Sequence, residues 1–312
     1  MKKVILVFTL LVTLFVAACQ QDEEFDLDAN ITVYTRDTTS GTRDGFMNGI
    51  GFGEAAKSDD VLVTGFVIRD NTAQLNAMQV DEYGIGYISL SSLSDDVKGL
   101  KFAGVDPTEA NVVNNTYLLK RPFVWMIRED GDFPGGANSP VEQLVKAFVA
   151  FLGTSDAADI INNAGAIALP SSVTWDSIKG DHPITQQNNS GVTVRFGGSD
   201  SIQKVAEALT QAFTAKAGNF VAEHDHTGSG DGWKRTNGDT KDQTVGKDVG
   251  FSSRPFTSAE LSNVTAAQHG QLAWDAIVAI VHNSNPISSV TADTLKKIYN
   301  GTYLTWSDVP NA

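Results

Sequence analysis

The chain has 312 residues and a formal net charge of −14, with 41% hydrophobic and 19% charged residues. This acidic balance argues against nucleic acid and anionic lipid surfaces as partners, because both repel a negatively charged surface. It does not exclude a small anion, because a few backbone N–H groups and one arginine can set the local field of a pocket. The length suits one large domain or two lobes of ordinary size.

The N-terminus has the layout of a secretory signal. Lys2 and Lys3 precede an apolar run that is too short to be a stable membrane span. Small residues then lead to Cys19, the only cysteine of the chain. We therefore expect residues 1–18 to be removed and Cys19 to be acylated as in a lipoprotein, with an ordinary signal peptide and a coincidental cysteine as the alternative. Residues 19–30 are polar and acidic, and we expect them to form a solvated tether.

Short β-branched and aromatic runs alternate with helical patterns along the rest of the chain. The predicted strands cover residues 31–34, 61–68, 85–88, 123–127, 192–196 and 276–281. The predicted helices cover residues 141–152 and 201–216, where apolar residues recur at helical spacing. This alternation predicts an α/β fold with largely parallel sheets. Residues 169–191 are polar and proline-containing, and are expected to form either a linker or a long surface loop inside one domain.

The most informative segment, Ile31 to Phe46, reads as a strand, a tight turn and the start of a helix. Ser40 or Thr39 is expected to cap that helix. The free backbone N–H groups of Gly41 and Thr42 and the hydroxyl groups of Ser40 and Thr42 would then surround one point. A helix N-terminus favours an anion, because its unpaired donors and its dipole both attract negative charge.

Arg36 lies at the predicted strand end, where it can contact two oxygens of a tetrahedral anion. A capped helix start is common in proteins, so an ordinary structural cap is the alternative for this segment alone. Three further turns are rich in glycine and serine, which lets the backbone approach a ligand closely. They are Gly197–Ser201, Thr227–Gly232 and Asp248–Arg254.

Together these segments resemble the phosphate-binding proteins of ABC importers, a family with the periplasmic-binding-protein-like fold. Thr35 to Phe46 resembles the family's phosphate-binding signature, and the similarity extends over nearly everything after the tether. The order of the halves is exchanged, because residues 194–306 resemble the family's opening half and residues 31–169 resemble its closing half. We interpret this order as a circular permutation, with a fragment of a tandem, two-copy protein as the alternative.

The resemblance implies a set of phosphate contacts when it is carried over position by position. These are Arg36, Ser40, Gly41, Thr42, Asp200, Ser201, Ser229 and Ser253. A threonine is more usual in the family at the position of Asp200, and some members carry an aspartate at the position of Ser253. Phosphate near neutral pH carries at least one O–H whereas sulfate carries none, so a carboxylate acceptor favours phosphate. We therefore predict that Asp200 takes the acceptor role that Ser253 cannot fill as a carboxylate would.

The resemblance also implies an architecture, a type II clamp of two α/β lobes, each with a central mixed sheet. Two crossing strands would join the lobes, which would close on the ligand like a hinge. One lobe would combine residues 31–115 with residues 282–312, and the other would comprise residues 116–281.

The implied function is capture of inorganic phosphate by a lipid-anchored, extracytoplasmic protein that serves the permease subunits of an ABC transporter. This protein would be a monomer without cofactor, metal, nucleic-acid partner or enzymatic activity. The rivals are binding of another tetrahedral oxyanion (sulfate, molybdate or tungstate), an extracellular phosphate sensor, and an extracellular hydrolase. Neither a recognised metal-ligand spacing around His224 and His226 nor a nucleophile elbow supports the hydrolase.

Overall fold

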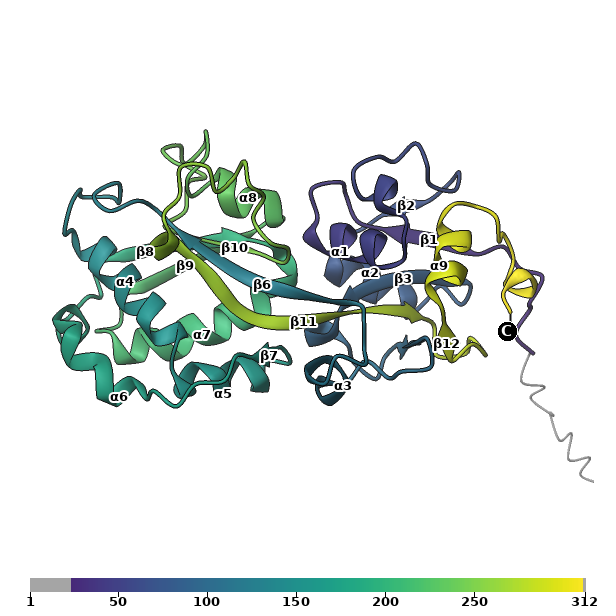
Figure 1. Cartoon of the computed structure of the whole chain (residues 1–312), viewed down its shortest axis with the longest axis horizontal. Coiled ribbons are helices and arrows are strands. Elements are labelled where there is room, and N and C mark those ends of the chain that lie inside the picture. The colour runs from purple at the N-terminus through teal and green to yellow at the C-terminus, as the bar shows by residue number, and fades with distance from the viewer. Residues whose placement is uncertain (1–23, 311–312) are drawn as a thin grey trace, which may run out of the picture.

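The computed structural model describes residues 24–310, so the predicted signal peptide and Cys19 lie outside the described residues. Two α/β lobes lie beside each other, and two long strands, β6 (Lys120–Ile127) and β11 (His269–Val281), run from one lobe into the other (Figure 1). Within residues 24–310, no helix combines the length and the apolar character needed to cross a membrane.

Ten of the described strands form one mixed sheet that continues across the hinge between the lobes, and two short strands form a separate pair. Besides the two crossing strands, the short and long strands of the protein are β1 (Thr32–Thr35), β2 (Val67–Ile68), β3 (Gly84–Ser89), β4 (Lys98–Gly99), β5 (Lys101–Phe102), β7 (Ile167–Ala168), β8 (Thr193–Gly198), β9 (Val221–His226), β10 (Val249–Ser252) and β12 (Ser289–Val290). The main strand order is β2-β1-β3-β11-β6-β10-β8-β9. Neighbours within each lobe are parallel, as in β1 with β3 and β8 with β10. The crossing strands are antiparallel to their neighbours, which makes the sheet mixed, as predicted.

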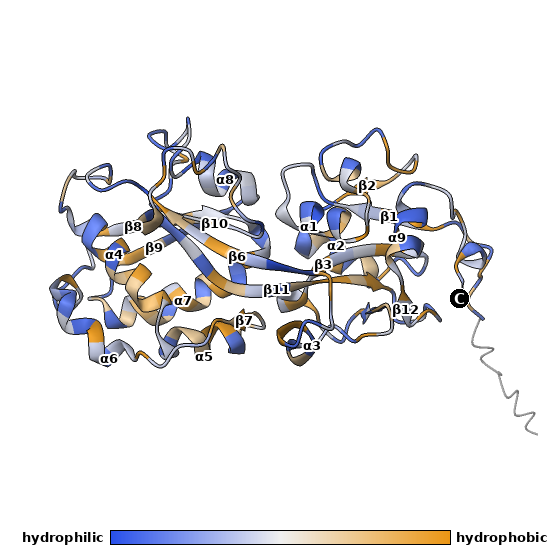
Figure 2. Cartoon of the chain, viewed as in Figure 1, coloured by the Kyte–Doolittle hydropathy of each residue, from blue (hydrophilic) through white to orange (hydrophobic). Residues whose placement is uncertain are grey.

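Helices cover the sheet in both lobes. They are α1 (Gly41–Gly49), α2 (Asn71–Met78), α3 (Glu109–Val113), α4 (Pro140–Leu152), α5 (Ser155–Asn163), α6 (Trp175–Ile178), α7 (Gln203–Lys216), α8 (Ser229–Lys234) and α9 (Ala292–Tyr299). The helix predicted over residues 141–152 is α4, which carries both apolar and polar positions (Figure 2) and buries its apolar residues in the core of the second lobe. The helix predicted over residues 201–216 is α7, preceded by a 3₁₀ turn, Asp200–Ile202.

Each lobe has its own hydrophobic core. In the first lobe, which we define as residues 24–119 and 276–310, stacked Phe46 and Tyr87 pack against Tyr299. In the second lobe, residues 120–275, Phe148 of α4 packs against Phe196 of β8 and against Phe213 of α7. The last residues of β11, 276–281, were expected in the second lobe but pack in the core of the first, because the crossing strand extends into that lobe.

Two sequence expectations differ from the fold. Of the strand predicted over residues 61–68, only β2 forms, because a turn at Gly65 with a φ of +88° interrupts the run. The linker expected over residues 169–191 is instead part of the second lobe, since Trp175 and Ile184 are buried in its core. The alternative, a long surface loop inside one domain, places the segment correctly, but the segment forms α6 and two 3₁₀ turns and is partly buried.

The described end of the expected tether lies against the first lobe. Phe25 packs its ring 5.2 Å from that of Tyr83. The carbonyl of Leu27 accepts a hydrogen bond of 2.6 Å from the N–H of Ser307. Apolar side chains at positions 25 and 27 explain why this part of an otherwise acidic segment contacts the folded protein.

Candidate functional site

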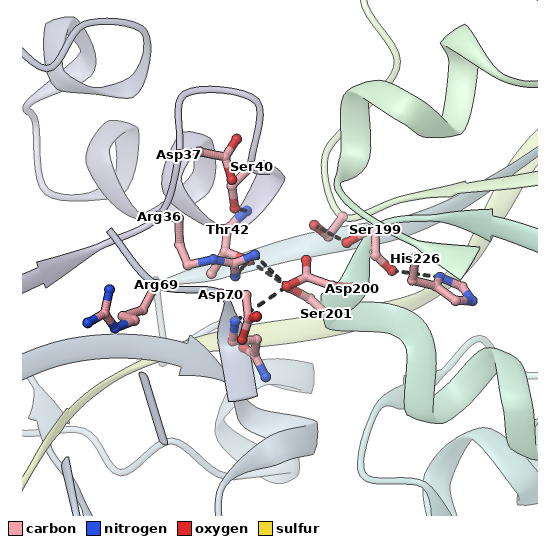
Figure 3. Close-up of polar contacts among 12 residues, drawn as sticks. Arg36, Asp37, Ser40, Thr42, Arg69, Asp70, Ser199, Asp200, Ser201 and His226 are labelled. Carbon is pink, nitrogen blue, oxygen red and sulfur yellow. Dashed lines mark hydrogen bonds and ion pairs between the residues drawn. The ribbon is translucent and has the colours of Figure 1, made fainter. Parts of the chain in front are cut away.

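The candidate site lies where the N-terminus of α1 in the first lobe faces turns of the second lobe (Figure 3). Strand β1 ends at Thr35 and α1 begins at Gly41, so the intervening turn projects from the sheet edge toward the hinge. The Ser40 hydroxyl caps α1 by accepting from the backbone N–H groups of Thr42 and Arg43 at 3.2 and 3.4 Å. The predicted N-cap is thus confirmed in the geometry of the helix start.

Arg36 is the central cation of this site and is only 2% exposed. Its Nη2 donates to Asp200 Oδ2 at 2.5 Å, and its Nη1 donates to Thr42 Oγ1 at 3.2 Å. Its Nε is buried and has no hydrogen-bond partner among the described residues. A buried guanidinium N–H without an acceptor is costly, so this atom marks a place where a bound anion would gain a strong contact.

A second buried arginine orients the loop that carries Arg36. The guanidinium of Arg43 donates to the carbonyl of Arg36 at 2.8 Å, to the carbonyl of Ala55 at 2.7 Å and to Asp59 at 2.6 Å. These contacts fix the backbone of the turn from inside the first lobe. Arg43 therefore supports the site and does not face the second lobe.

Asp200 and Ser201 begin the 3₁₀ turn before α7, and both contact the first lobe, Asp200 through Arg36 and Ser201 through Thr42. Ser201 Oγ lies 2.7 Å from Thr42 Oγ1. Burial raises the pKa of the Asp200 carboxyl, but the charge and hydrogen bond of Arg36 outweigh burial, so the pKa lies below its ordinary value. Asp200 is therefore a carboxylate at neutral pH and can accept a proton donated by a ligand.

Three serine hydroxyls form a buried cluster in the second lobe, against the first turn of α1. Ser253 Oγ lies 2.9 Å from Ser199 Oγ and 3.0 Å from Ser229 Oγ. A Cβ at Gly41 would lie 2.6 Å from Ser253 Oγ and would also overlap Ser229 Oγ. A side chain at position 41 would therefore have to displace these two hydroxyls or keep the lobes further apart.

The structure brings all of the sequence-predicted site residues to one place between the lobes. Arg36, Ser40, Gly41 and Thr42 come from the first lobe, and the other four come from three separate turns of the second. The donors of one lobe meet acceptors and hydroxyls of the other, as in the pairs formed by Arg36 with Asp200 and by Thr42 with Ser201.

Sequence reasoning missed a buried ion pair beside these residues. Arg121 on β6 donates through Nε and Nη2 to Asp275 on β11 at 3.0 and 2.9 Å, and through Nη1 to Ser253 Oγ at 3.1 Å. Ser89 of the first lobe donates to Asp275 at 2.7 Å. Burial raises the pKa of Asp275. In the sequence, Arg121 and Asp275 are each only a charged residue at the edge of an apolar run. Their pairing depends on the register of β6 and β11, which the sequence does not show.

The described residues contain no group of three or more His, Cys, Asp or Glu side chains arranged to hold a metal ion. A cavity of 470 Å³ lies elsewhere in the second lobe, beside Glu129, Trp233 and Lys241. It contains none of the predicted site residues. The candidate site is therefore defined by converging donors at the contact of the lobes.

Residues 184–312 match the model of the PBP superfamily domain. The chain is 28% identical over 284 residues to phosphate-binding protein PstS 2 of Streptococcus pneumoniae, covering 89% of this chain and 87% of that protein. The same comparison with phosphate-binding protein PstS 2 of Streptococcus agalactiae gives 24% identity over 297 residues, 94% of this chain and 92% of that one. The chain is thus a homologue of the phosphate-binding proteins of ABC transporters, as the resemblance predicted.

A solved structure supports the same relationship. The crystal structure of a phosphate-binding protein of a phosphate ABC transporter from Streptococcus pneumoniae matches this fold with a TM-score of 0.63 and 25% identity, over 90% of this chain and 100% of that chain. The predicted α/β periplasmic-binding-protein-like fold is confirmed by this match.

The segments of the chain follow the same order as in these relatives. A single alignment of 284 residues covers 89% of the chain in order, so its segments follow one another as they do in that protein. Circular permutation relative to family members of the opposite order stays a prediction.

Proposed function

We propose that this protein captures inorganic phosphate between its two lobes, outside the cytoplasm, and delivers it to the permease of an ABC transporter. The observation that carries the proposal is the buried Arg36, which contacts the Asp200 turn of the other lobe and whose Nε has no hydrogen-bond partner among residues 24–310. The phosphate-binding relatives support the ligand, and the chemistry of a tetrahedral anion fits a guanidinium surrounded by hydroxyl and backbone donors.

The first lobe would supply most of the positive field. Arg36 would contact two phosphate oxygens, and the hydroxyls of Ser40 and Thr42 together with the N–H groups of Gly41 and Thr42 would contact others. In the structure Thr42 Oγ1 and Ser201 Oγ bond to each other. Phosphate would enter between these two hydroxyls, and each hydroxyl would then bond to a phosphate oxygen instead of to the other hydroxyl.

The second lobe would complete the shell and set selectivity. Ser201, Ser229 and Ser253 would donate hydroxyl or backbone N–H groups, and Asp200 would accept the phosphate O–H. Oδ2 of Asp200 is bonded to Arg36 and to the N–H of Asn71, which leaves Oδ1 for the ligand. Sulfate brings no proton and would place its negative charge against this carboxylate.

The interaction energies are sufficient for tight binding. Hydrogen bonds to charged groups contribute roughly 1.5–3 kcal/mol each. About six of them exceed the roughly 8 kcal/mol of a micromolar complex, even after the cost of association. Closure of the lobes strengthens each contact by excluding water. Binding alone accounts for the site, in line with homologues that are binding proteins and not enzymes.

The lipid anchor on Cys19 is part of this proposal, as is location on the outer face of the cell membrane as a monomer. Replacement of Cys19 by alanine would then release the protein from membranes into the medium, which cell fractionation would detect. Retention of Cys19→Ala in the membrane fraction would exclude acylation of this cysteine as the anchor.

The decisive test is isothermal titration of the chain from Gln20 onward with phosphate, with sulfate, molybdate and tungstate as competitors. We expect micromolar or tighter binding of phosphate that equimolar sulfate fails to displace. Arg36→Ala should abolish binding. Arg69→Ala is the matched control, because Arg69 is an exposed arginine near the site whose guanidinium bonds to the carbonyl of Ile68. Displacement of phosphate by another oxyanion, or equal binding by Arg36→Ala, would contradict the proposal.

A further inference from the structure

Two histidines of β9 lie on one face of the strand and extend from α7 toward the candidate site. The rings of His224 and His226 are nearly parallel, at 16° with centroids 5.3 Å apart. They lie between Phe196 and Phe251, whose rings are 5.2 Å from His224 and 6.2 Å from His226. This row is built into the sheet, since His224 and His226 pair with Phe196 and Gly198 of β8.

A chain of hydrogen bonds runs along this row. Thr210 Oγ1 on α7 lies 2.9 Å from His224 Nε2, and His224 Nδ1 lies 3.0 Å from His226 Nε2. At the other end, His226 Nδ1 lies 3.0 Å from the backbone carbonyl of Ser199, the residue directly before Asp200 (Figure 3).

The Ser199 carbonyl, at the end of this row of hydrogen bonds, determines which ring nitrogen of each histidine carries a proton. A carbonyl oxygen only accepts, so His226 must carry its proton on Nδ1 and donate it to Ser199. In neutral His226, Nε2 is then an acceptor, which requires the proton of His224 on Nδ1. Nε2 of His224 is then an acceptor for the Thr210 hydroxyl, whose other acceptor within reach is the carbonyl of Glu207 at 3.1 Å. Both neutral histidines are thus held as Nδ1–H tautomers.

The turn that receives this hydrogen bond is also held by the residues after His226. The N–H groups of Thr227 and Gly228 donate to the carbonyl of Gly198 at 2.8 and 2.9 Å. Gly198 has a φ of +107°, and a Cβ there would overlap the backbone carbonyl of Phe251. Three consecutive residues, His226 to Gly228, therefore fasten the turn before Asp200 and lead directly into Ser229 at the start of α8.

We propose that His226 is a positioning residue, whose Nδ1–H holds the Ser199 carbonyl and thereby aligns the Asp200–Ser201 turn with the Ser229 turn for anion binding. This inference rests on the proposed function for its ligand, but the hydrogen-bond chain itself exists without ligand. The charged groups that face the two rings are Glu207 of α7, Lys247 and Asp200. Burial, followed by the neighbouring His224, lowers the pKa of His226 to about 4, so the required neutral form persists at physiological pH.

The first arm of the test compares His226→Phe with His226→Asn in phosphate titrations at pH 7.5. Phenylalanine keeps the packing between rings but removes the donor, and we expect it to weaken phosphate binding about tenfold, the effect of one lost hydrogen bond. The Asn amide places an N–H near the position of Nδ1, and His226→Asn should stay within about threefold of the parent protein. His182→Phe is the control, because His182 packs on Trp175 away from the site. Equal affinity of His226→Phe and the parent protein would overturn the inference.

The second arm needs no ligand. ¹⁵N spectra of the imidazole groups of the ligand-free protein should show both His224 and His226 as Nδ1–H tautomers, and His226→Phe should speed amide exchange in residues 199–201 while His182→Phe does not. An Nε2–H tautomer at His226 would overturn the inference whatever the ligand. If the parent protein binds no phosphate but gives the expected tautomers and exchange, the proposed function fails and the positioning of the turn stands.

Discussion

At the scale of single residues, Arg36 and Asp200 place two opposite charges side by side at the candidate anion site. The arginine supplies positive field, and the aspartate adds a negative charge at 2.5 Å from it. A carboxylate costs affinity for a fully deprotonated anion and adds affinity for one that carries a proton. Under the proposed function, selectivity at this site would therefore depend on the proton of the ligand.

The substitution Asp200→Asn tests this role of the carboxylate. We expect phosphate affinity to fall about tenfold, because a charge-assisted acceptor for the phosphate O–H is lost. Sulfate affinity should rise, because a repulsive charge is removed. Titration of both anions into variant and parent measures the change in preference. An unchanged phosphate-to-sulfate ratio would show that Asp200 does not select the ligand.

The site residues differ in how far the sequence alone predicted them. Ser40 and Thr42 belong to a local pattern, a capped helix start after a strand, and local patterns are visible in sequence. Asp200 and Ser229 came from the family resemblance together with their position at glycine-rich turns. Arg121 was not predicted, because its partner Asp275 follows 154 positions later and only strand pairing brings them together.

At the scale of elements, β6 and β11 carry the connection between the lobes, and the buried pair of Arg121 and Asp275 fastens them at the point of crossing. The two residues are direct partners in the antiparallel register. Arg121 bonds to Ser253 of the second lobe and Asp275 accepts from Ser89 of the first. The pair thus joins the hinge strands to both lobes.

Removal of one partner of this pair should be costly. Asp275→Ala leaves the guanidinium of Arg121 buried without its counter-charge, and we expect a loss of about 3–5 kcal/mol in the free energy of unfolding. Urea denaturation measures this loss. Asp293→Ala is the control, because its pair with Lys297 is exposed and should contribute less than about 1 kcal/mol. Similar losses in the two variants would contradict a special role for the buried pair.

At the level of β9, we expect His226 to make the free energy of unfolding depend on pH. His226 has a pKa of about 4 in the folded protein and 6.5 as its ordinary value, so the unfolded chain binds more protons between these values. Stability from this group is therefore complete above about pH 6.5 and falls as the pH drops toward 4, by up to about 3 kcal/mol. Urea midpoints from pH 7.5 to 4.5 should show a shallower decline for His226→Asn. Parallel declines would mean that other groups control acid stability.

The elements show why some strands were predicted well and others were not. β3 and β8 are buried runs bounded by turns, and their sequence pattern was sufficient. β11 begins at His269, well before the predicted residue 276. Its first residues are polar or glycine, and they form a strand because they pair with β6. Such tertiary pairing overrides local propensity.

At the scale of the whole molecule, the distance between the lobes is limited by the smallest residue at their contact. Gly41 lies against Ser229 and Ser253 with no room for a methyl group. Its φ is not in the left-handed region, so alanine suits the helix itself and would be resisted only when the lobes close.

The substitution Gly41→Ala should therefore separate stability from closure. We expect the free energy of unfolding to stay the same or rise by up to about 1 kcal/mol, whereas phosphate affinity should fall at least about tenfold. Small-angle scattering should show that added phosphate no longer compacts the variant as it does the parent protein. Asn48→Ala, an exposed change on the same helix, is the control. Normal compaction of Gly41→Ala would show that this contact does not limit closure.

The crossing strands also determine the order in which the two cores can be completed during synthesis. The second lobe is one continuous stretch, so its core is complete in the emerging chain once Ala273 has been made. The first lobe is interrupted by it, and Phe46 and Tyr87 wait for Tyr299 and residues close to the end of the described chain. Domains fold as units as they emerge, so the half of the protein that is translated first is the last to fold. Its apolar segments stay without their core partners until residues 276–309 have been made.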